Sequence, residues 1–351
     1  MKIAQIAPLC ESVPPRLYGG TERVVAQLTD ALVAQGHDVT LFASADSRTR
    51  ARLAPMRRQA LRLDPAPLKL DIAAHLTMLD EVRRRADEFD VLHFHIDLLH
   101  FPFFEHMAER TLTTLHGRLD LVDLPDAYRR WRRYPLVSIS NSQRRPLPFA
   151  NWLGTVHHGV PLELFTFSSN PGNHLAFIGR ISPEKRPDRA IEIARRAGRA
   201  LKIAAKIDAV DAAYHREKIE PLLAADHVEF IGEVDDVGKN ALLGSATALL
   251  FPIDWPEPFG LAMIEAMACG TPVIAWNNGS VREIVEPGVT GFIVDSMEAA
   301  VAAVRQAERL DRRAVRAAFE RRFSSRTMAS AYVRLYSQLT AANRDSIAKG
   351  A

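Results

Sequence analysis

The sequence predicts an α/β fold of two doubly wound, parallel-sheet domains that face each other across a cleft. Short apolar strand candidates alternate with amphipathic helical patterns along the whole chain. This alternation stops once, at a stretch of turn-forming residues near the middle, and then starts again. A length of 351 residues suffices for two hydrophobic cores.

The first half carries the first run of strands. Apolar and β-branched runs predict strands at Lys2–Ala7, Val39–Ala43, Val91–Phe94, Thr111–Leu115, Val137–Ser140 and Thr155–His157. Helical spacing of apolar residues lies between several of them, as at Thr21–Gln35 and Leu70–Glu88. Turn formers dominate the later part of residues 161–173, which therefore suit a linker.

The second half repeats the pattern. Strands are expected at His174–Ile178, Leu201–Ala205, Val228–Ile231, Ala248–Phe251, Pro272–Ala275 and Gly291–Val294. Helices are expected at Pro187–Ala197, near Tyr214–Leu223 and Lys239–Ser245, after Gly260, and at Met297–Arg309 and Met328–Leu339. We set the domains at residues 1–165 and 166–324, with the helix at about 325–345 packing back on the first domain.

Composition excludes several classes of protein. The formal charge of +3 is too small to indicate a nucleic-acid-binding protein. Two scattered cysteines, Cys10 and Cys269, fit a reducing compartment, although one disulfide stays open. The N-terminus is typical of a first strand rather than a signal peptide, and no apolar run is long enough to span a membrane. We expect a soluble, cytoplasmic protein.

The most informative stretch is Glu257–Thr271, between two buried strands. Its helix is expected to begin near Gly260 and to end at Gly270. Glu257 then lies on the loop after a strand, where parallel sheets bind ligands, whereas Glu265 lies inside the helix. Hydroxyl or phosphate oxygens would meet the backbone N–H groups of Phe259, Gly260 and Leu261.

In each half, one further turn follows the first strand. Arg180 and Lys185 flank one turn and suit a diphosphate, or else form a solvated basic turn. At the other turn Gly20 or Thr21 contacts a phosphate, or else Thr21 simply caps the helix. The three-glycine dinucleotide pattern is absent there, which disfavours a dinucleotide site.

Histidines and arginines form two further clusters. His93 and His95 alternate onto one face of a strand, and His116 ends the next strand, but no full zinc ligand set accompanies them. The aromatic-flanked stretch Arg129–Arg133 fits a solvated helix face, and leaves open a peripheral membrane contact, an anionic acceptor or nucleic acid.

These motifs, in this order, resemble the retaining glycosyltransferases of the family 4 (group 1) type, which have the GT-B fold of two Rossmann-like domains. The resemblance covers nearly the whole chain. It rests on the two glutamates of Glu257–Glu265 and on Tyr18–Glu22, His116-Gly117, Gly179-Arg180 with Glu184-Lys185, Gly232-Glu233 and Cys269–Ala275.

The resemblance implies a role for each site residue. Arg180 and Lys185 would hold the diphosphate, Glu257 the sugar hydroxyls and Glu265 the ribose. Gly20 would donate to a phosphate, and His116 would bond the sugar near its reacting carbon. Transfer would retain the anomeric configuration by same-face substitution, with no metal and no cofactor. The first domain would bind the acceptor and the second the nucleotide sugar.

Several alternatives stay open. A UDP-sugar is favoured over a GDP-sugar on family frequency, and the acceptor is an unidentified small molecule, glycan or lipid. The segment 204–208 departs from the glycine-rich turn of the family, so Lys206 is either an extra phosphate contact or a surface lysine. A sugar-nucleotide epimerase, a phosphorylase and a non-catalytic nucleotide-sugar-binding protein are the competing hypotheses. Phe101, Phe103 and Phe104 suggest an apolar rim at the acceptor side, or else core packing.

Overall fold

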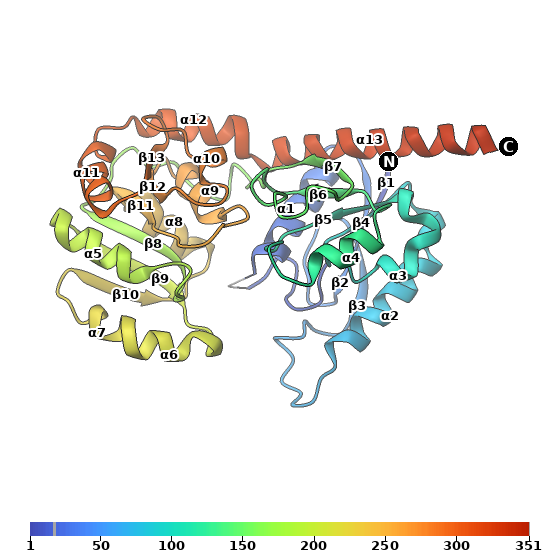
Figure 1. Ribbon diagram of the computed structural model, residues 1–351, viewed down its shortest axis with the longest axis horizontal. Coiled ribbons are helices and arrows are strands. Elements are labelled where there is room, and N and C mark those ends of the chain that lie inside the picture. The colour runs from blue at the N-terminus through green and yellow to red at the C-terminus, as the bar shows by residue number, and fades with distance from the viewer. Residues whose placement is uncertain (17–18, 351) are drawn as a thin grey trace. The chain divides into compact units, whose positions relative to one another are not determined.

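The computed structural model describes residues 1–16 and 19–350 and divides into two compact units (Figure 1). The first comprises Met1–Gly159 and the C-terminal segment from Ser325, and the second comprises Val160–Ser324. The division falls earlier than the boundary drawn after residue 165. Residues 160–165 belong to the second unit because their backbone bonds to α12 (Arg312–Phe323): Val160 N donates to Phe323 O at 2.8 Å, and Phe165 O accepts from the Arg316 guanidinium at 2.9 Å.

A seven-stranded, fully parallel sheet forms the first unit. Its inner strands are buried along nearly their whole length, as expected for a parallel sheet with helices on both faces. The strand order is β3 (Arg52–Arg57), β2 (Asp38–Ser44), β1 (Lys2–Ile6), β4 (Val91–Phe94), β5 (Thr111–Thr114), β6 (Leu136–Ser138) and β7 (Trp152–Thr155).

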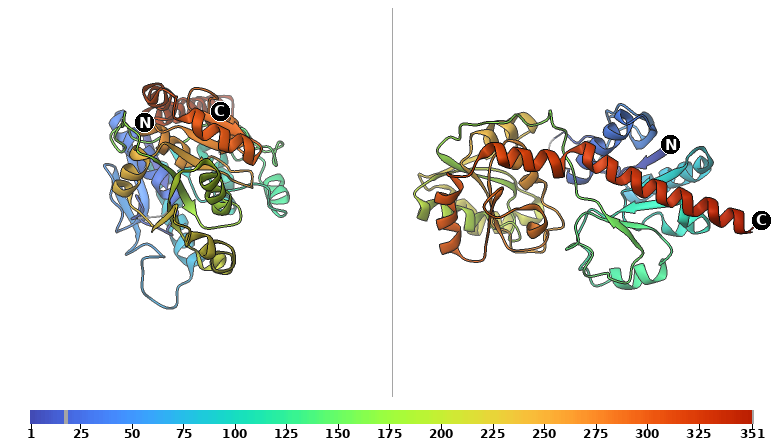
Figure 2. Two further views of the ribbon diagram at one scale, coloured as in Figure 1. Left: turned by 90° about the vertical axis from the view of Figure 1, so that its left-hand side faces the viewer. Right: turned by 90° about the horizontal axis from the view of Figure 1, so that it is seen from above.

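Helices cover both faces of this sheet. Figure 2 shows α13 lying across the first unit with α1 beside it. No helix in the described part of the chain is both long and apolar enough to cross a membrane. The helices of this unit are α1 (Gly20–Ala34), α2 (Asp71–Arg84), α3 (Phe101–Phe104), α4 (Leu124–Arg130) and α13 (Ser325–Gly350), with 3₁₀ turns at Ala86–Glu88 and Glu105–Arg110.

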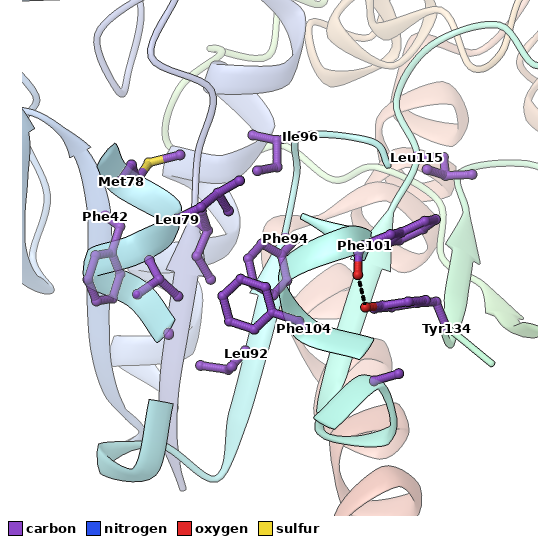
Figure 3. Packing of buried hydrophobic residues seen from close by; sticks show 14 of the residues in the cluster. Phe42, Met78, Leu79, Leu92, Phe94, Ile96, Phe101, Phe104, Leu115 and Tyr134 are labelled. Carbon is purple, nitrogen blue, oxygen red and sulfur yellow. Dashed lines mark hydrogen bonds between the residues drawn. The ribbon is translucent and has the colours of Figure 1, made fainter. Parts of the chain in front are cut away.

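Aromatic residues fill the core on the sheet face opposite to α13 (Figure 3). Phe101 and Phe104 are fully buried there, so the interpretation of these two as an apolar rim is wrong. The Tyr134 hydroxyl donates to the Phe101 carbonyl, and the two rings stack with centroids 4.1 Å apart. Only Phe103 of the three phenylalanines is exposed, at 41%.

The second unit contains a six-stranded parallel sheet. Its order is β10 (Val228–Gly232), β9 (Ala200–Lys206), β8 (His174–Arg180), β11 (Ala248–Phe251), β12 (Val273–Trp276) and β13 (Gly291–Val294). The helices are α5 (Pro187–Ala197), α6 (Ala212–Tyr214), α7 (Glu220–Leu223), α8 (Asp236–Ser245), α9 (Leu261–Ala268), α10 (Val281–Ile284), α11 (Met297–Ala307) and α12 (Arg312–Phe323), with short turns at Ala209–Asp211 and His215–Ile219.

Besides short helices such as α3 and α10, a few elements differ from the sequence prediction. The strand expected at Thr155–His157 lies slightly earlier, as β7, because Gly154 and Thr155 pair with Val137 and Ser138. The edge strand β3 and the arginine-rich helix α12 were not predicted. Both cysteines are free, and they lie in different units.

Arg312, at the start of α12, ties together the loops at the opposite end of the second sheet from Arg180. It is 7% exposed and donates to the carbonyl oxygens of Ser168 and Ala246 at 2.7 and 2.9 Å. It also donates to the Thr271 hydroxyl at 2.7 Å and the Gly244 carbonyl at 3.1 Å. One guanidinium therefore satisfies several backbone acceptors that are shielded from water.

Replacing Arg312 by methionine should destabilise the second unit by about 3 kcal/mol, because it leaves these buried acceptors unpaired. Arg313→Met, on the exposed side of the same helix, is the matched control. Hydrogen exchange resolved by unit, with denaturant unfolding, measures the effect. Equal losses in the two variants would show that Arg312 does not play this role.

Candidate functional site

Polar side chains gather where the second sheet reverses its strand order. Strands β8 and β11 are neighbours, and the chain builds outward from them to β9 on one side and to β12 on the other. Arg180 is the last residue of β8, whereas Glu257 follows β11 and precedes α9. Such a switch point is where open parallel sheets bind their ligands.

An ion pair connects the loops that follow these two strands. Lys185 Nζ donates to Glu257 Oε2, and Trp255 Nε1 donates to the same oxygen at 2.9 Å. Lys185 Nζ also lies 5.2 Å from the centroid of the Trp255 ring. The Lys185 and Glu257 side chains are only 17% and 11% exposed, so water screens their attraction weakly. An ammonium group has three donors, and Glu257 uses one of them.

A glycine supports the loop that carries Glu257. Gly279 has a φ of +58°, and a Cβ added to it would overlap the backbone N and O of Glu257. The next residue, Ser280, donates from its backbone N to Glu257 O at 3.0 Å and from its hydroxyl to Phe259 O at 2.7 Å. These two residues were not predicted from the sequence, although an isolated glycine after a buried strand is a signal for close backbone approach.

Glu265 is buried inside α9, as the sequence indicated, and it has a partner. Lys239 Nζ of α8 donates to Glu265 Oε1 at 2.9 Å. The Glu265 side chain is 3% exposed and the Lys239 side chain 13%. Burial and the charge of Glu265 raise the pKa of nearby Cys269 to about 12, so this thiol is protonated near neutral pH. Lys239 is a site residue that sequence reasoning missed.

Arg180 lies in a cluster of opposite charges. Its guanidinium is 3.1 Å from Asp211, 3.2 Å from Glu184 and 3.7 Å from Asp208. Lys206 pairs with Arg180 in the β8–β9 register, and its Nζ lies 2.9 Å from Asp208. These carboxylates orient two cations at the carboxyl end of adjacent strands, and an anionic ligand would compete with them.

The N-terminus of α9 lies in this same loop region. Gly260 adopts a left-handed conformation before the helix, with φ of +84°, and no side chain caps the helix start. Leu261 is the first helical residue, and the Phe259 side chain is buried. The N–H groups of a first helical turn lack acceptors within the helix and therefore favour an oxygen ligand.

The remaining predicted residues lie in the first unit. His116 follows β5, and its backbone neighbours Leu115 O and Gly117 O each accept from Gln143 Nε2 at 2.8 Å. Burial lowers the pKa of His116 to about 3, so its ring is neutral near pH 7. Gly20 is the first residue of α1 and Thr21 the second, with Gly19 as N-cap.

Some interpretations of this unit need correction. Thr21 is not the N-cap of α1, because the helix begins one residue earlier. Tyr18 of the glycine motif lies outside the described residues. In the arginine stretch, Arg129 pairs with Asp126 at 2.9 Å and Arg133 with Glu109 at 2.8 Å. Ion pairs with carboxylates therefore balance the charge of two of its four arginines.

His93 and His95 use both ring nitrogens in hydrogen bonds, which leaves no lone pair for a metal. Across residues 1–16 and 19–350, no group of three or more His, Cys, Asp or Glu side chains is arranged to hold a metal ion.

The fold and the sites define the class of protein. Two parallel-sheet units, of seven and six strands, with polar residues at the carboxyl ends of the strands are the GT-B architecture. A crystal structure of a glycosyltransferase involved in avilamycin A biosynthesis is similar, with a TM-score of 0.74 and 26% identity over 97% of this chain and 98% of that one.

Family models agree with this class. The model for glycosyl transferases group 1 matches residues 166–322, and the model for glycosyltransferase family 4 matches residues 18–146. The chain therefore belongs to the glycosyltransferases of the group 1, family 4 type. The first match lies within the second unit and the other within the first.

Two curated relatives are also similar in sequence. The phosphatidyl-myo-inositol mannosyltransferase of Mycobacterium leprae is 27% identical over 380 residues, which cover 96% of each chain. The D-inositol 3-phosphate glycosyltransferase of Mycolicibacterium smegmatis is 30% identical over 192 residues, which cover 50% of this chain and 43% of the relative.

Replacing Gly279 by alanine should displace the Glu257 loop and destabilise the second unit by about 2–4 kcal/mol. Gly288→Ala is the control, because Gly288 also has a positive φ, +78°, but has nothing within 4 Å of an added Cβ. The control should lose only about 1–2 kcal/mol from backbone strain. Urea unfolding measures both, and equal losses would contradict the packing argument.

Proposed function

We propose that this protein transfers a hexose-type sugar from a nucleoside-diphosphate sugar to an acceptor hydroxyl, with retention of the anomeric configuration and without a metal ion. The observation that carries the proposal is the gathering of Arg180, Lys185 and Glu257 at the switch point of the second sheet, next to the start of α9. A UDP-sugar is the favoured donor and a GDP-sugar the alternative.

The donor's diphosphate suits the cationic part of this site. Arg180 presents a planar fork of donors and Lys185 a point charge with donors to spare. The backbone N–H groups of Phe259, Gly260 and Leu261 would bind sugar hydroxyls or phosphate oxygens at the helix start. Lys206, beside Arg180 in the β8–β9 register, would add a further phosphate contact.

The two glutamates suit hydroxyl groups. Glu265 would accept hydrogen bonds from the ribose hydroxyls through the carboxylate that Lys239 orients. Glu257 would accept from hydroxyls of the transferred sugar, with Lys185 and Trp255 holding its other contacts. In the first unit, Gly20 and Thr21 would contact a phosphate, and His116 would bond the sugar.

The reaction is a substitution at the anomeric carbon. The bond from this carbon to the β-phosphate oxygen breaks, and a bond to the acceptor oxygen forms on the same face. The acceptor's proton passes to the leaving phosphate oxygen, so no separate protein base is needed. Arg180 and Lys185 would stabilise the negative charge that grows on the diphosphate in the transition state.

Inositol-containing lipids and inositol phosphates are the acceptors to test first. The two curated relatives act, by their names, on phosphatidyl-myo-inositol and D-inositol 3-phosphate. Both acceptors offer a secondary ring hydroxyl beside a phosphate. The second candidate class is a non-catalytic nucleotide-sugar-binding protein, and an epimerase is the third.

The proposal is tested in two steps. Thermal shift is first measured with UDP, GDP, ADP and their hexose derivatives. The best binder is then assayed for release of nucleoside diphosphate in the presence of inositol acceptors. Transfer predicts binding, acceptor-dependent release and a glycosylated product. Binding without release would favour the non-catalytic alternative, and a new sugar nucleotide without release would favour the epimerase. No binding at all would contradict the proposed donor site.

Arg180→Gln should lower kcat by about 100-fold with a much smaller rise in the donor KM, because the leaving-group charge develops mainly in the transition state. Arg195→Gln is the control, since Arg195 is an exposed arginine that pairs with Glu192 of its own helix. Steady-state kinetics measure the two parameters. An equal effect on kcat and binding would exclude a leaving-group role for Arg180.

Glu265→Gln should weaken nucleoside-diphosphate binding by about 1.5–3 kcal/mol through loss of charge-assisted hydrogen bonds. It also removes the nearer of the two carboxylates beside Lys239 and leaves only the more distant Asp236, at 3.8 Å, so stability falls as well. The double variant Glu265→Gln/Lys239→Met should recover stability but not affinity. Calorimetry measures binding, with Glu298→Gln on the surface of α11 as control. Affinity that returns with stability would refute the ribose contact.

A further inference from the structure

A chain of buried polar side chains runs through the first unit and ends at His116. Gln5, His93, His95 and Tyr336 are each at most 3% exposed. Gln5 lies opposite His93 in the β1–β4 register, on the sheet face that α13 covers with Tyr336. The sequence placed His93 and His95 on one face of a strand and His116 at the end of the next strand, but no local signal linked them to Gln5.

Every link in this chain has hydrogen-bond distance. His116 Nε2 lies 2.9 Å from His95 Nδ1, and His95 Nε2 lies 2.7 Å from Gln5 Oε1. Gln5 Nε2 lies 3.1 Å from the Tyr336 hydroxyl, which lies 2.7 Å from His93 Nδ1. The last link joins His93 Nε2 to the Thr114 hydroxyl at 2.7 Å.

The chemistry of Gln5 fixes the proton on each ring near it. Burial lowers the pKa of His95 well below its usual value and that of His116 to about 3, so each ring is neutral and carries one proton near pH 7. In the structure Gln5 Oε1 faces His95, and an amide oxygen only accepts, so this orientation of the Gln5 amide puts the His95 proton on Nε2. His95 Nδ1 is then an acceptor, and His116 must donate to it from Nε2. The free lone pair of His116 is therefore on Nδ1.

The hydrogen bonds from Gln5 to Thr114 are consistent with the same direction of donation. Gln5 Nε2 donates to the Tyr336 oxygen, and the Tyr336 hydroxyl donates to His93 Nδ1. His93 then donates from Nε2 to the Thr114 hydroxyl. With Gln5 Oε1 toward His95 and Nε2 toward Tyr336, one direction of donation thus satisfies all of these contacts.

His116 Nδ1 is the end of the chain that lacks a protein contact. This atom is buried and has no hydrogen-bond partner among the described residues. The ring itself is held, because His158 stacks on it with centroids 5.3 Å apart and an interplanar angle of 19°. A fixed, buried acceptor without a partner marks a place where a ligand donor completes the contacts.

We propose that Gln5 and His95 are positioning residues that hold His116 in the tautomer with an unprotonated Nδ1, so that His116 accepts a hydrogen bond from a hydroxyl of the transferred sugar. The tautomer follows from the chain itself, whereas the sugar hydroxyl as its ligand rests on the proposed function. A neutral acceptor of this kind rejects a donor sugar that lacks the hydroxyl, because the buried lone pair would then stay unpaired.

The tautomer can be measured on the free protein. ¹⁵N-histidine labelling and two-bond ¹⁵N–¹H correlation report which ring nitrogen carries the proton, and His116→Gln identifies the His116 signals. We expect an unprotonated Nδ1 and a protonated Nε2 for His116 in the wild type. In Gln5→Met the two nitrogens should move toward a mixture of tautomers. A protonated Nδ1 in the wild type would overturn the proposal, with no variant required and no dependence on transfer.

Kinetics then test the link to the ligand. Gln5→Met should lower kcat/KM for the donor by about tenfold. The same substitution in a His116→Ala background should have no further effect, because it acts through His116. Equal losses in both backgrounds would show that Gln5 only stabilises the fold. Gln27→Met, at another buried glutamine of the first unit, is the control.

Discussion

The contact between Lys185 and Glu257 is the interaction on which the arrangement of the second unit's site depends. It joins the loops after β8 and β11, the two strands from which the sheet builds in opposite directions. Burying two charges costs several kcal/mol unless their geometry is well satisfied. Trp255 supplies a further donor to Glu257, and Gly279 lets the adjacent backbone approach closely. The loop backbone is therefore built around the pair, and the start of α9 is placed by the same loop.

The two units present polar groups by different physical means. In the second unit, opposite charges orient one another: Lys185 with Glu257, and Lys239 with Glu265. In the first unit, hydrogen-bond donation runs in one direction from His116 through neutral side chains, first to His95 and then to the Gln5 amide. A neutral chain tolerates deeper burial than a charged one, because it avoids the cost of removing ions from water. Cationic groups suit a diphosphate, whereas a neutral acceptor suits a sugar hydroxyl.

Much of this architecture could be predicted from the sequence. Central strands such as β11 are buried on both faces and read as continuous apolar runs, and Gly260 and Gly270 bracket α9. Strand β3 was not predicted, because an edge strand with Arg52, Pro55 and Arg57 lacks a continuous apolar run. Helix α12 was not predicted, because its many arginines obscure the apolar pattern of the buried Val315, Ala318 and Phe319.

Partners within the site were harder to predict than the residues themselves. The sequence singled out Glu265 but not Lys239, because a lysine on a neighbouring helix has no local signal. The same limit applies to Gln5 and Tyr336, which lie 331 residues apart in the sequence and meet only after α13 packs on the sheet. Local periodicity reports burial and secondary structure, whereas these contacts depend on tertiary packing. Assignment to the group 1, family 4 glycosyltransferases rests on motifs spread over both units.

The most direct test of the account is the anomeric configuration of the first product, followed by ¹H NMR from the start of the reaction with the sugar nucleotide that binds best. The account predicts a glycosylated acceptor whose anomeric proton has the same configuration as the donor, together with one nucleoside diphosphate per product. An inverted anomer would contradict same-face substitution. A sugar nucleotide that binds but never yields a glycoside would contradict the assignment of Arg180, Lys185 and Glu257 to group transfer.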